Sequence, residues 1–137
     1  MPKACTRKPS PGVIQVRHPS EQTGDLRFLG GSASDAFNTI LANQVTNALW
    51  LARADEDERQ KRMSAAVAGL AGIGPRDELE GMLAGQLIAA HSATMECYRR
   101  AMMPEQPFEG WREALTQANK LSRTYATLLE AAIAADL

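Results

Sequence analysis

The residues that most often carry chemistry are few in this chain and lie far apart. His91 and Cys97 share one apolar-rich stretch, whereas His18 and Cys5 lie near the N-terminus. A histidine that binds a metal or acts as a general base needs a carboxylate or a second histidine nearby, which on a helix means three or four residues away. The residues at those distances from His91 are Leu87, Ile88, Thr94 and Met95. We therefore expect a hydrogen-bonded histidine in the core or at an interface.

Cys97 follows Glu96 and precedes Arg100 by three residues. A cation one helical turn away lowers the pKa of a thiol and favours the reactive thiolate. Cys97 also belongs to a row of small residues, where a cysteine is ordinarily buried and inert. We favour the inert cysteine and predict no catalytic residue in this chain.

The carboxylates do not form a recognisable metal site either. Glu78, Glu80 and Glu96 lack the Glu-x-x-His spacing of di-iron helical bundles. The cysteines lack the spacing of a zinc site, and the Gly-Ile-Gly sequence at 72–74 follows no strand and lacks a phosphate-binding fingerprint. The sequence predicts no metal, no cofactor and no enzymatic activity.

One long helix, expected over residues 76–103, would hold both the histidine and the cysteine of the apolar-rich stretch. Pro75 precedes it, and Asp77 and Glu80 have the spacing of a capping box. Two arginines precede Pro104 and suit the negative end of the helix dipole. At about 1.5 Å per residue this helix would be about 42 Å long, which predicts partner helices.

Every fourth residue over much of this helix is small. The row consists of Gly81, Gly85, Ala89, Ala93 and Cys97. A ridge of small side chains lets another backbone approach closely, and each mid-helix glycine costs about 1 kcal/mol relative to alanine, so a packing role is expected. We predict that this row is an interface between two copies of the chain, with packing against other helices of the same chain as the alternative.

Two shorter helices are expected before the long one. The sequence Ser32-Ala33-Ser34-Asp35 supplies N-cap choices for a first helix, expected over about residues 34–53. A charge run in which acids precede bases begins a second helix, over about residues 55–72, because acids complement the positive end of the helix dipole. We interpret that charge run as a solvated first turn.

The last helix is expected over about residues 108–134, where apolar residues recur at helical spacing. A short proline-containing turn at 104–107 would force it antiparallel to the preceding helix. The expected fold class is all-α: a helical bundle with a long antiparallel hairpin over residues 76–135 and two shorter helices.

Residues 1–31 are expected to form a flexible or arm-like segment of irregular structure, and residues 32–137 the helical domain. The N-terminal segment contains four of the seven prolines and four of the ten glycines, so it cannot build a core of its own. Its first 20 residues carry four Lys or Arg and no acid. Nucleic-acid binding through this basic arm is therefore an alternative function, although the arm has no Arg-rich run.

The composition limits the number of domains, the secondary structure and the classes of binding partner that we expect. The length of 137 residues suits one domain, and the 45% of hydrophobic and 5% of aromatic residues suit helices. A net charge of −1 gives no overall field that would collect nucleic acid or an anionic membrane. Neither a run of 18 apolar residues nor a signal-peptide core is present, so we expect a cytoplasmic protein that does not bind membranes.

Three blocks carry a resemblance to a known group. The sequences GPRDELEGM at 74–82, MECYRRAM at 95–102 and QANKLSRTYATLLEA at 117–131 are similar to those of a group of short helical proteins from alphaproteobacteria. The similarity spans about residues 30–131. The resemblance implies a small helical bacterial protein, and it implies no activity because the group has no assigned function.

These observations favour a non-enzymatic helical protein that acts in interaction or regulation and forms a homodimer or higher homo-oligomer. Its protein partner and pathway are unknown. The alternatives are a nucleic-acid-associated protein that uses the basic N-terminal arm, or a small metal-binding or enzymatic helical protein.

Overall fold

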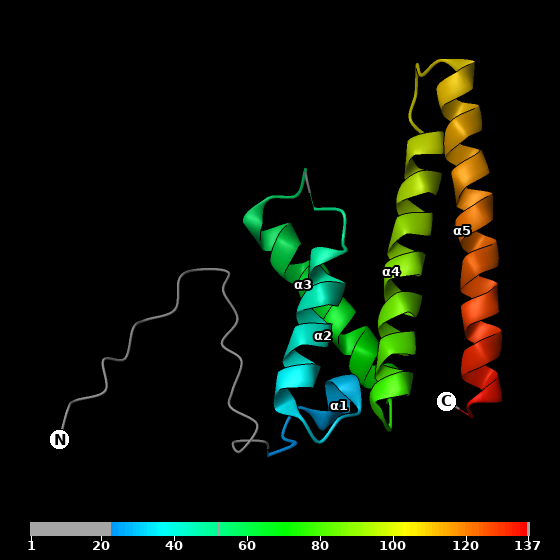
Figure 1. Cartoon of the computed structure of the whole chain (residues 1–137). Helices are drawn as coiled ribbons and strands as arrows, with labels where there is room; N and C mark the ends of the chain where they lie inside the picture. Colours follow the sequence, from blue (N-terminus) through cyan, green and yellow to red (C-terminus); the bar gives the residue numbers. More distant parts are fainter. Residues whose placement is uncertain (1–22, 52, 137) are drawn as a thin grey trace.

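The computed structural model describes residues 23–51 and 53–136, and within this part of the chain it contains helices and no strand. The prediction of an all-α fold is therefore confirmed. The helices, in chain order, are α1 (Arg27–Gly30), α2 (Asp35–Asn47), α3 (Glu56–Ile73), α4 (Glu78–Ala101) and α5 (Phe108–Ala134) (Figure 1).

Side chains cap the starts of α2, α3 and α4. The Ser34 side chain accepts a hydrogen bond from the backbone N–H of Phe37, and Asp55 caps α3 in the same way. At the start of α4, Asp77 Oδ1 accepts from the backbone N–H of Glu80 at 2.8 Å. These caps satisfy N–H groups that have no partner inside their own helix, which fixes where each helix begins.

The helix expected over residues 34–53 ends at Asn47, so its predicted C-terminal end is wrong. Tertiary contacts hold the following residues outside the helix. Leu49 packs against the core, and the carbonyl of Trp50 accepts a hydrogen bond of 2.9 Å from Arg62 Nη1. The guanidinium of Arg100 lies 4.5 Å from the centre of the Trp50 ring. Because these partners lie on α3 and α4, helical periodicity alone did not reveal the break.

Helix α1 was not predicted, and residues 23–31, assigned to the arm from sequence, form part of the helical body. The Asp35 carboxylate accepts hydrogen bonds from the Thr23 hydroxyl at 2.6 Å and from the Leu26 backbone N–H at 3.0 Å. Leu29 is 7% exposed and packs in the core. Hydrogen bonds to the Asp35 carboxylate thus hold residues 23–31 against the helical body. Residues 1–22 of the expected arm lie outside the described residues.

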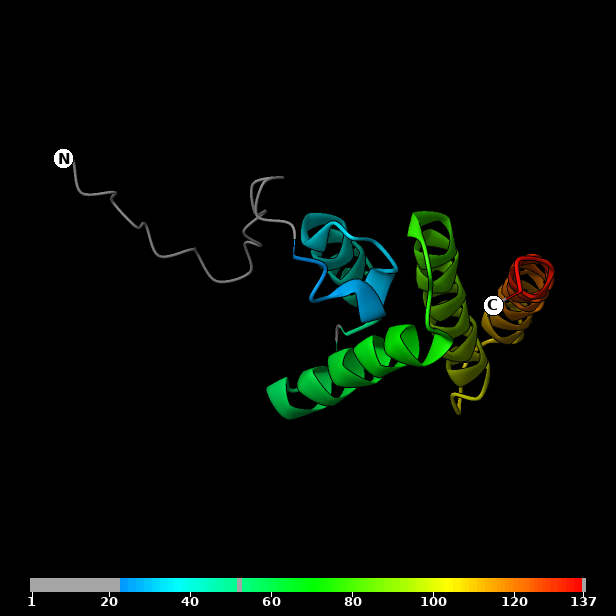
Figure 2. The ribbon, with the colours of Figure 1, turned by 90° about the horizontal axis from the view of Figure 1, so that it is seen from below.

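The buried core is built where α1, α2, α3 and α4 meet. Its central cluster consists of Leu29, Val45, Ala66, Leu70 and Ala84, and Leu70 and Ala84 are fully buried. No residue of α5 belongs to this cluster. Figure 2 shows the reason: α2 and α3 lie on one side of α4, and α5 lies on the other.

Helices α4 and α5 lie side by side and run in opposite directions (Figure 1). Tyr98, near the C-terminal end of α4, and Ser122, in the middle of α5, are hydrogen-bonded at 3.3 Å. Arg76 and Ala135 are hydrogen-bonded at 2.9 Å, where α4 begins and α5 ends. Among the described helices, α5 makes extensive contact only with α4. Much of its surface is therefore free of contact with the rest of the fold.

Candidate functional site

The row of small residues singled out from the sequence divides into two parts. A Cβ atom on Gly81 would overlap the carbonyl oxygen of Gly30, and one on Gly85 would lie 3.1 Å from Leu41 Cδ1. These two glycines are buried against α1 and α2 of the same chain. For Gly81 and Gly85 the structure therefore shows packing within the chain, the alternative that the sequence left open.

Ala89, Ala93 and Cys97 are half-buried and are displaced around the helix from the two glycines. Four residues advance a helix by about 400°, so each step along the row turns it by about 40°. By Cys97 the row has moved about 160° from Gly81. Together with Leu79, Met82 and Gln86, these three residues form what we call the outer face of α4.

The outer face of α4 is apolar and partly open to solvent. Leu79 is 71% exposed and Met82 is 44% exposed. Near Cys97, a shallow depression of about 370 Å³ continues onto α5, where Gly110, Ala114 and Gln117 line it. Further residues on this side of α5, at helical spacing, are Leu121, Thr124, Leu128 and Ala131. None of these residues is charged. Arg53, Arg99, Arg100 and Glu113 also line the depression, so charged side chains border the uncharged surface at its Cys97 end.

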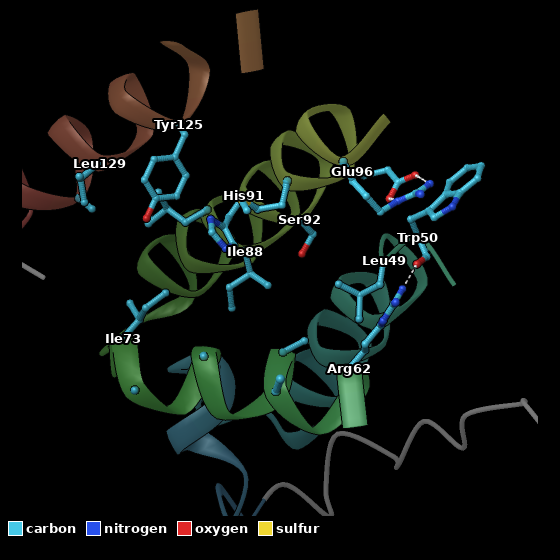
Figure 3. A pocket seen from close by; sticks show the side chains of 18 of the residues that line it. Leu49, Trp50, Arg62, Ile73, Ile88, His91, Ser92, Glu96, Tyr125 and Leu129 are labelled. Carbon is cyan, nitrogen blue, oxygen red and sulfur yellow. Dashed lines mark hydrogen bonds and ion pairs between the residues drawn. The ribbon is translucent and has the colours of Figure 1, made fainter. Parts of the chain in front are cut away.

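A second feature, which we call the groove, lies between α3 and α5 with α4 as its floor (Figure 3). Its volume is about 900 Å³. Ile73, Ile88, Leu129 and Ile133 line one end, and Trp50, Arg62, Glu96 and Arg99 line the other. The groove thus has an apolar end and a charged end.

Glu96 organises the charged end. Its Oε1 accepts hydrogen bonds from Arg99 Nη2 at 2.8 Å and from Arg100 Nε at 3.0 Å, and its Oε2 accepts from Arg99 Nε at 2.9 Å. These bonds, with those from Arg99 making the larger contribution, lower the pKa of Glu96 to about 2. Glu96 therefore stays ionised at neutral pH and holds both arginines in place.

His91, which was predicted to lie in the core or at an interface, is exposed at the edge of the groove, so the first of these two placements is wrong. Its ring lies beside that of Tyr125 on α5, with 6.1 Å between the ring centroids and a tilt of 54° between the planes. Figure 3 shows the imidazole among the groove residues rather than inside the helical core. A role for His91 at an interface stays a prediction.

No protein-family model, curated protein or solved structure matches this chain. Function must therefore be argued from the side chains themselves.

Among residues 23–51 and 53–136, no group of three or more His, Cys, Asp or Glu side chains is arranged to hold a metal ion. In the same part of the chain, no helix combines the length and the apolar character that crossing a membrane requires.

The sequence did not reveal the groove, because its walls come from three helices whose mutual angles are set by packing. The sequence predicts a solvated first turn for the charge run at 53–62, which includes Arg62, and a helix over 34–53, which includes Trp50. The available signal was the pair Gly69 and Gly72, which lack the side chains that would otherwise fill this side of α3.

Proposed function

We propose that this chain is a non-enzymatic interaction protein that self-associates, most simply as a two-fold dimer, through the outer face of α4 and the adjoining side of α5. One observation carries the proposal. The residues of this surface between Leu79 and Ala93 on α4 and between Leu121 and Ala131 on α5 are uncharged, and they include the exposed side chains of Leu79 and Met82. Charged residues border the surface at the depression near Cys97. Depletion of charged residues distinguishes the centres of protein interfaces from ordinary protein surface.

The area of this surface is also large enough for a specific dimer interface. A helix of 24 residues is about 36 Å long, and two helices packed about 9 Å apart present a face about 20 Å wide. The product is about 700 Å², close to the roughly 800 Å² per partner that specific complexes bury. A second copy of the same face can cover it in a two-fold arrangement.

The centre of the face is suited to close packing. Ala89, Ala93 and Cys97 project little beyond the helix backbone, so a helix of the second copy can approach closely there. Leu79 and Met82, towards one end, would then become buried, at a gain of about 25 cal/mol for each Å² of apolar surface removed from water.

Light scattering on the purified protein at micromolar concentration tests the proposal. The unaltered chain should have about twice the mass of one chain. The double variant Leu79→Glu, Met82→Glu should have the mass of one chain, because two carboxylates would have to be buried at the interface. Acidic residues near the start of a helix are compatible with its dipole, so the variant should keep its helical circular dichroism.

Ile133→Glu is the matched control, since Ile133 is 66% exposed but lies at the groove. It should leave the dimer intact. A monomeric unaltered protein, or an equal mass for the double variant and the control, would contradict the proposal. Gly85→Leu is unsuitable here because its side chain would meet Leu41 and Val45 inside the chain.

A further inference from the structure

The groove lies on the opposite side of α4 from the outer face. Ile88, Met95 and Arg99 line it, and helical periodicity places them about half a turn around α4 from Leu79 and Cys97. The two surfaces meet only at the charged end, where Trp50 and Arg99 line both the groove and the depression near Cys97, so an occupant of the groove would leave Leu79 and Met82 open. Its volume of about 900 Å³ falls within the range of small-molecule sites, which reach about 1,000 Å³ and are mostly apolar with a few polar groups.

We propose that the groove binds a small amphiphile that has an aliphatic chain and an anionic head group. The chain would lie against the apolar end, and the head group would lie between Arg62 and Arg99. The proposal depends on the sorting of side chains along the groove, and it does not depend on self-association.

At the apolar end, Ile88 forms part of the floor and Leu129 and Ile133 form one wall. Leu129 is 41% exposed and Ile133 is 66% exposed, so apolar surface remains to be covered. The opposite wall, formed by α3, leaves open space at Gly72. A Cβ atom on Gly72 would meet no heavy atom within 4 Å, which shows open space beside α3 at this point.

At the charged end, positive charge exceeds negative charge. Arg62 pairs with Glu58 at 2.7 Å, and Arg99 and Arg100 share Glu96. Of these groups, the guanidinium groups of Arg62 and Arg99 and the carboxylate of Glu96 line the groove itself, so two positive charges face one negative charge there. The side chains of Arg62 and Arg99 are 45% and 49% exposed, so both can donate N–H groups to a further anion.

The length of the groove also suits such a molecule. Ile88 and Arg99 stand at opposite ends of its floor, and the 11 residue steps between them span about 16 Å of helix. An extended ten-carbon carboxylate, at about 1.25 Å per carbon along a chain with bonds of about 1.5 Å, measures about 12 Å. It covers about 12 of these 16 Å, and the Arg99 side chain can close the remaining distance because long side chains on a helix lean toward its N-terminus.

The positive charge at the arginine end also argues against binding of the chain's own N-terminal residues in the groove. Residues 1–20 carry four Lys or Arg and no acid, so that segment would bring like charge to Arg62 and Arg99. An anionic amphiphile brings the opposite charge together with an apolar body.

Isothermal titration calorimetry with decanoate, kept below its micelle concentration, tests the site. We expect saturable binding of one decanoate per chain and at least about tenfold weaker binding of decyltrimethylammonium, whose head group has the opposite charge. Absence of saturable decanoate binding, or equal binding of the two amphiphiles, would overturn the proposal.

Two pairs of variants locate the binding. Gly72→Leu places a side chain in the open space of the groove and should weaken decanoate binding at least about tenfold, whereas Ala68→Leu, on an exposed part of α3 outside the groove, should change it less than about twofold. Arg99→Gln should weaken binding about fivefold or more, and Arg123→Gln, exposed on α5, should not.

Equal affinities within each pair would show that decanoate binds elsewhere and would overturn the assignment to the groove. Saturable binding of an acidic amphipathic Leu/Glu peptide without binding of decanoate would also overturn it and would identify the groove as a helix-docking site. Light scattering on Gly72→Leu should give the mass of the unaltered protein, so a failed ligand site and a failed dimer are distinguishable.

Discussion

Arg76 and Ala135 are 59 residues apart, yet Arg76 Nη2 donates a hydrogen bond of 2.9 Å to the carbonyl oxygen of Ala135. The same nitrogen lies 2.7 Å from Glu80 Oε1, and the Glu80 side chain is only 7% exposed. The hydrogen bond from Arg76 lowers the pKa of the Glu80 carboxyl. One guanidinium thus joins a buried acid at the start of α4 to the last turn of α5.

Arg76→Ala should lower the melting temperature of the protein. The substitution leaves the buried Glu80 carboxylate without its cationic partner and removes a donor from a carbonyl at the end of α5. Thermal unfolding followed by circular dichroism measures the change. Lys61→Ala is the control, because Lys61 and its partner Asp57 are both more than 75% exposed and such pairs contribute little. Equal melting temperatures for the two variants would refute the role of Arg76.

Two glycine-to-alanine substitutions should change stability in opposite directions. Gly81→Ala introduces a Cβ atom into the carbonyl oxygen of Gly30, so backbone must shift, and we expect a loss of about 2 kcal/mol or more. Gly72→Ala introduces the same atom into open space inside a helix and should gain up to about 1 kcal/mol. Urea unfolding of both variants measures the free energies. A stabilising Gly81→Ala would show that α1 does not pack closely on α4.

Stability should fall in acid through the Asp35 carboxylate. Hydrogen bonds from the Thr23 hydroxyl and then the Leu26 backbone N–H lower the pKa of Asp35 to about 2, against an ordinary value of 3.8. A folded-state pKa below the unfolded value stabilises the fold above about pH 4, and this contribution is lost as the pH falls to about 2. Asp35→Asn should be less stable at pH 7 and should lose less stability between pH 5 and pH 2. Melting temperatures over this range, for the variant and the unaltered protein, check the sign.

The sequence contained enough information to place most of the helices. Ser34, one of the candidate N-caps, caps α2, and the expected start and end of the last helix coincide with those of α5. These features depend on local rules: a capping side chain, a proline before the first turn and apolar residues at helical spacing. Local rules also identified Gly81 as a packing position, although they did not identify its neighbour.

The remaining features depend on contacts between residues far apart in the chain. Leu49 and Trp50 continue a helical pattern, but the structure places them in a loop because Arg62 and Arg100 bind that loop from other helices. Residues 23–31 look irregular in sequence and are held by Asp35. The groove follows from the divergence of α3 and α5, and no spacing of residues along a single helix shows that angle.

The absence of α5 residues from the core cluster divides the protein into parts of unequal resistance to local unfolding. Detaching α5 exposes its contacts with α4 and leaves the packing of Leu29, Val45 and Leu70 in place. Proteins open in cooperative units whose free energies range from near zero to that of global unfolding. Backbone amides in α5 should therefore exchange with deuterium before those around Leu70 in α3. We therefore expect α5 to detach from α4 and pack against it again while α1 to α4 stay folded. Any partner that covers α4 and α5 together would also lengthen the time for which the two helices stay packed.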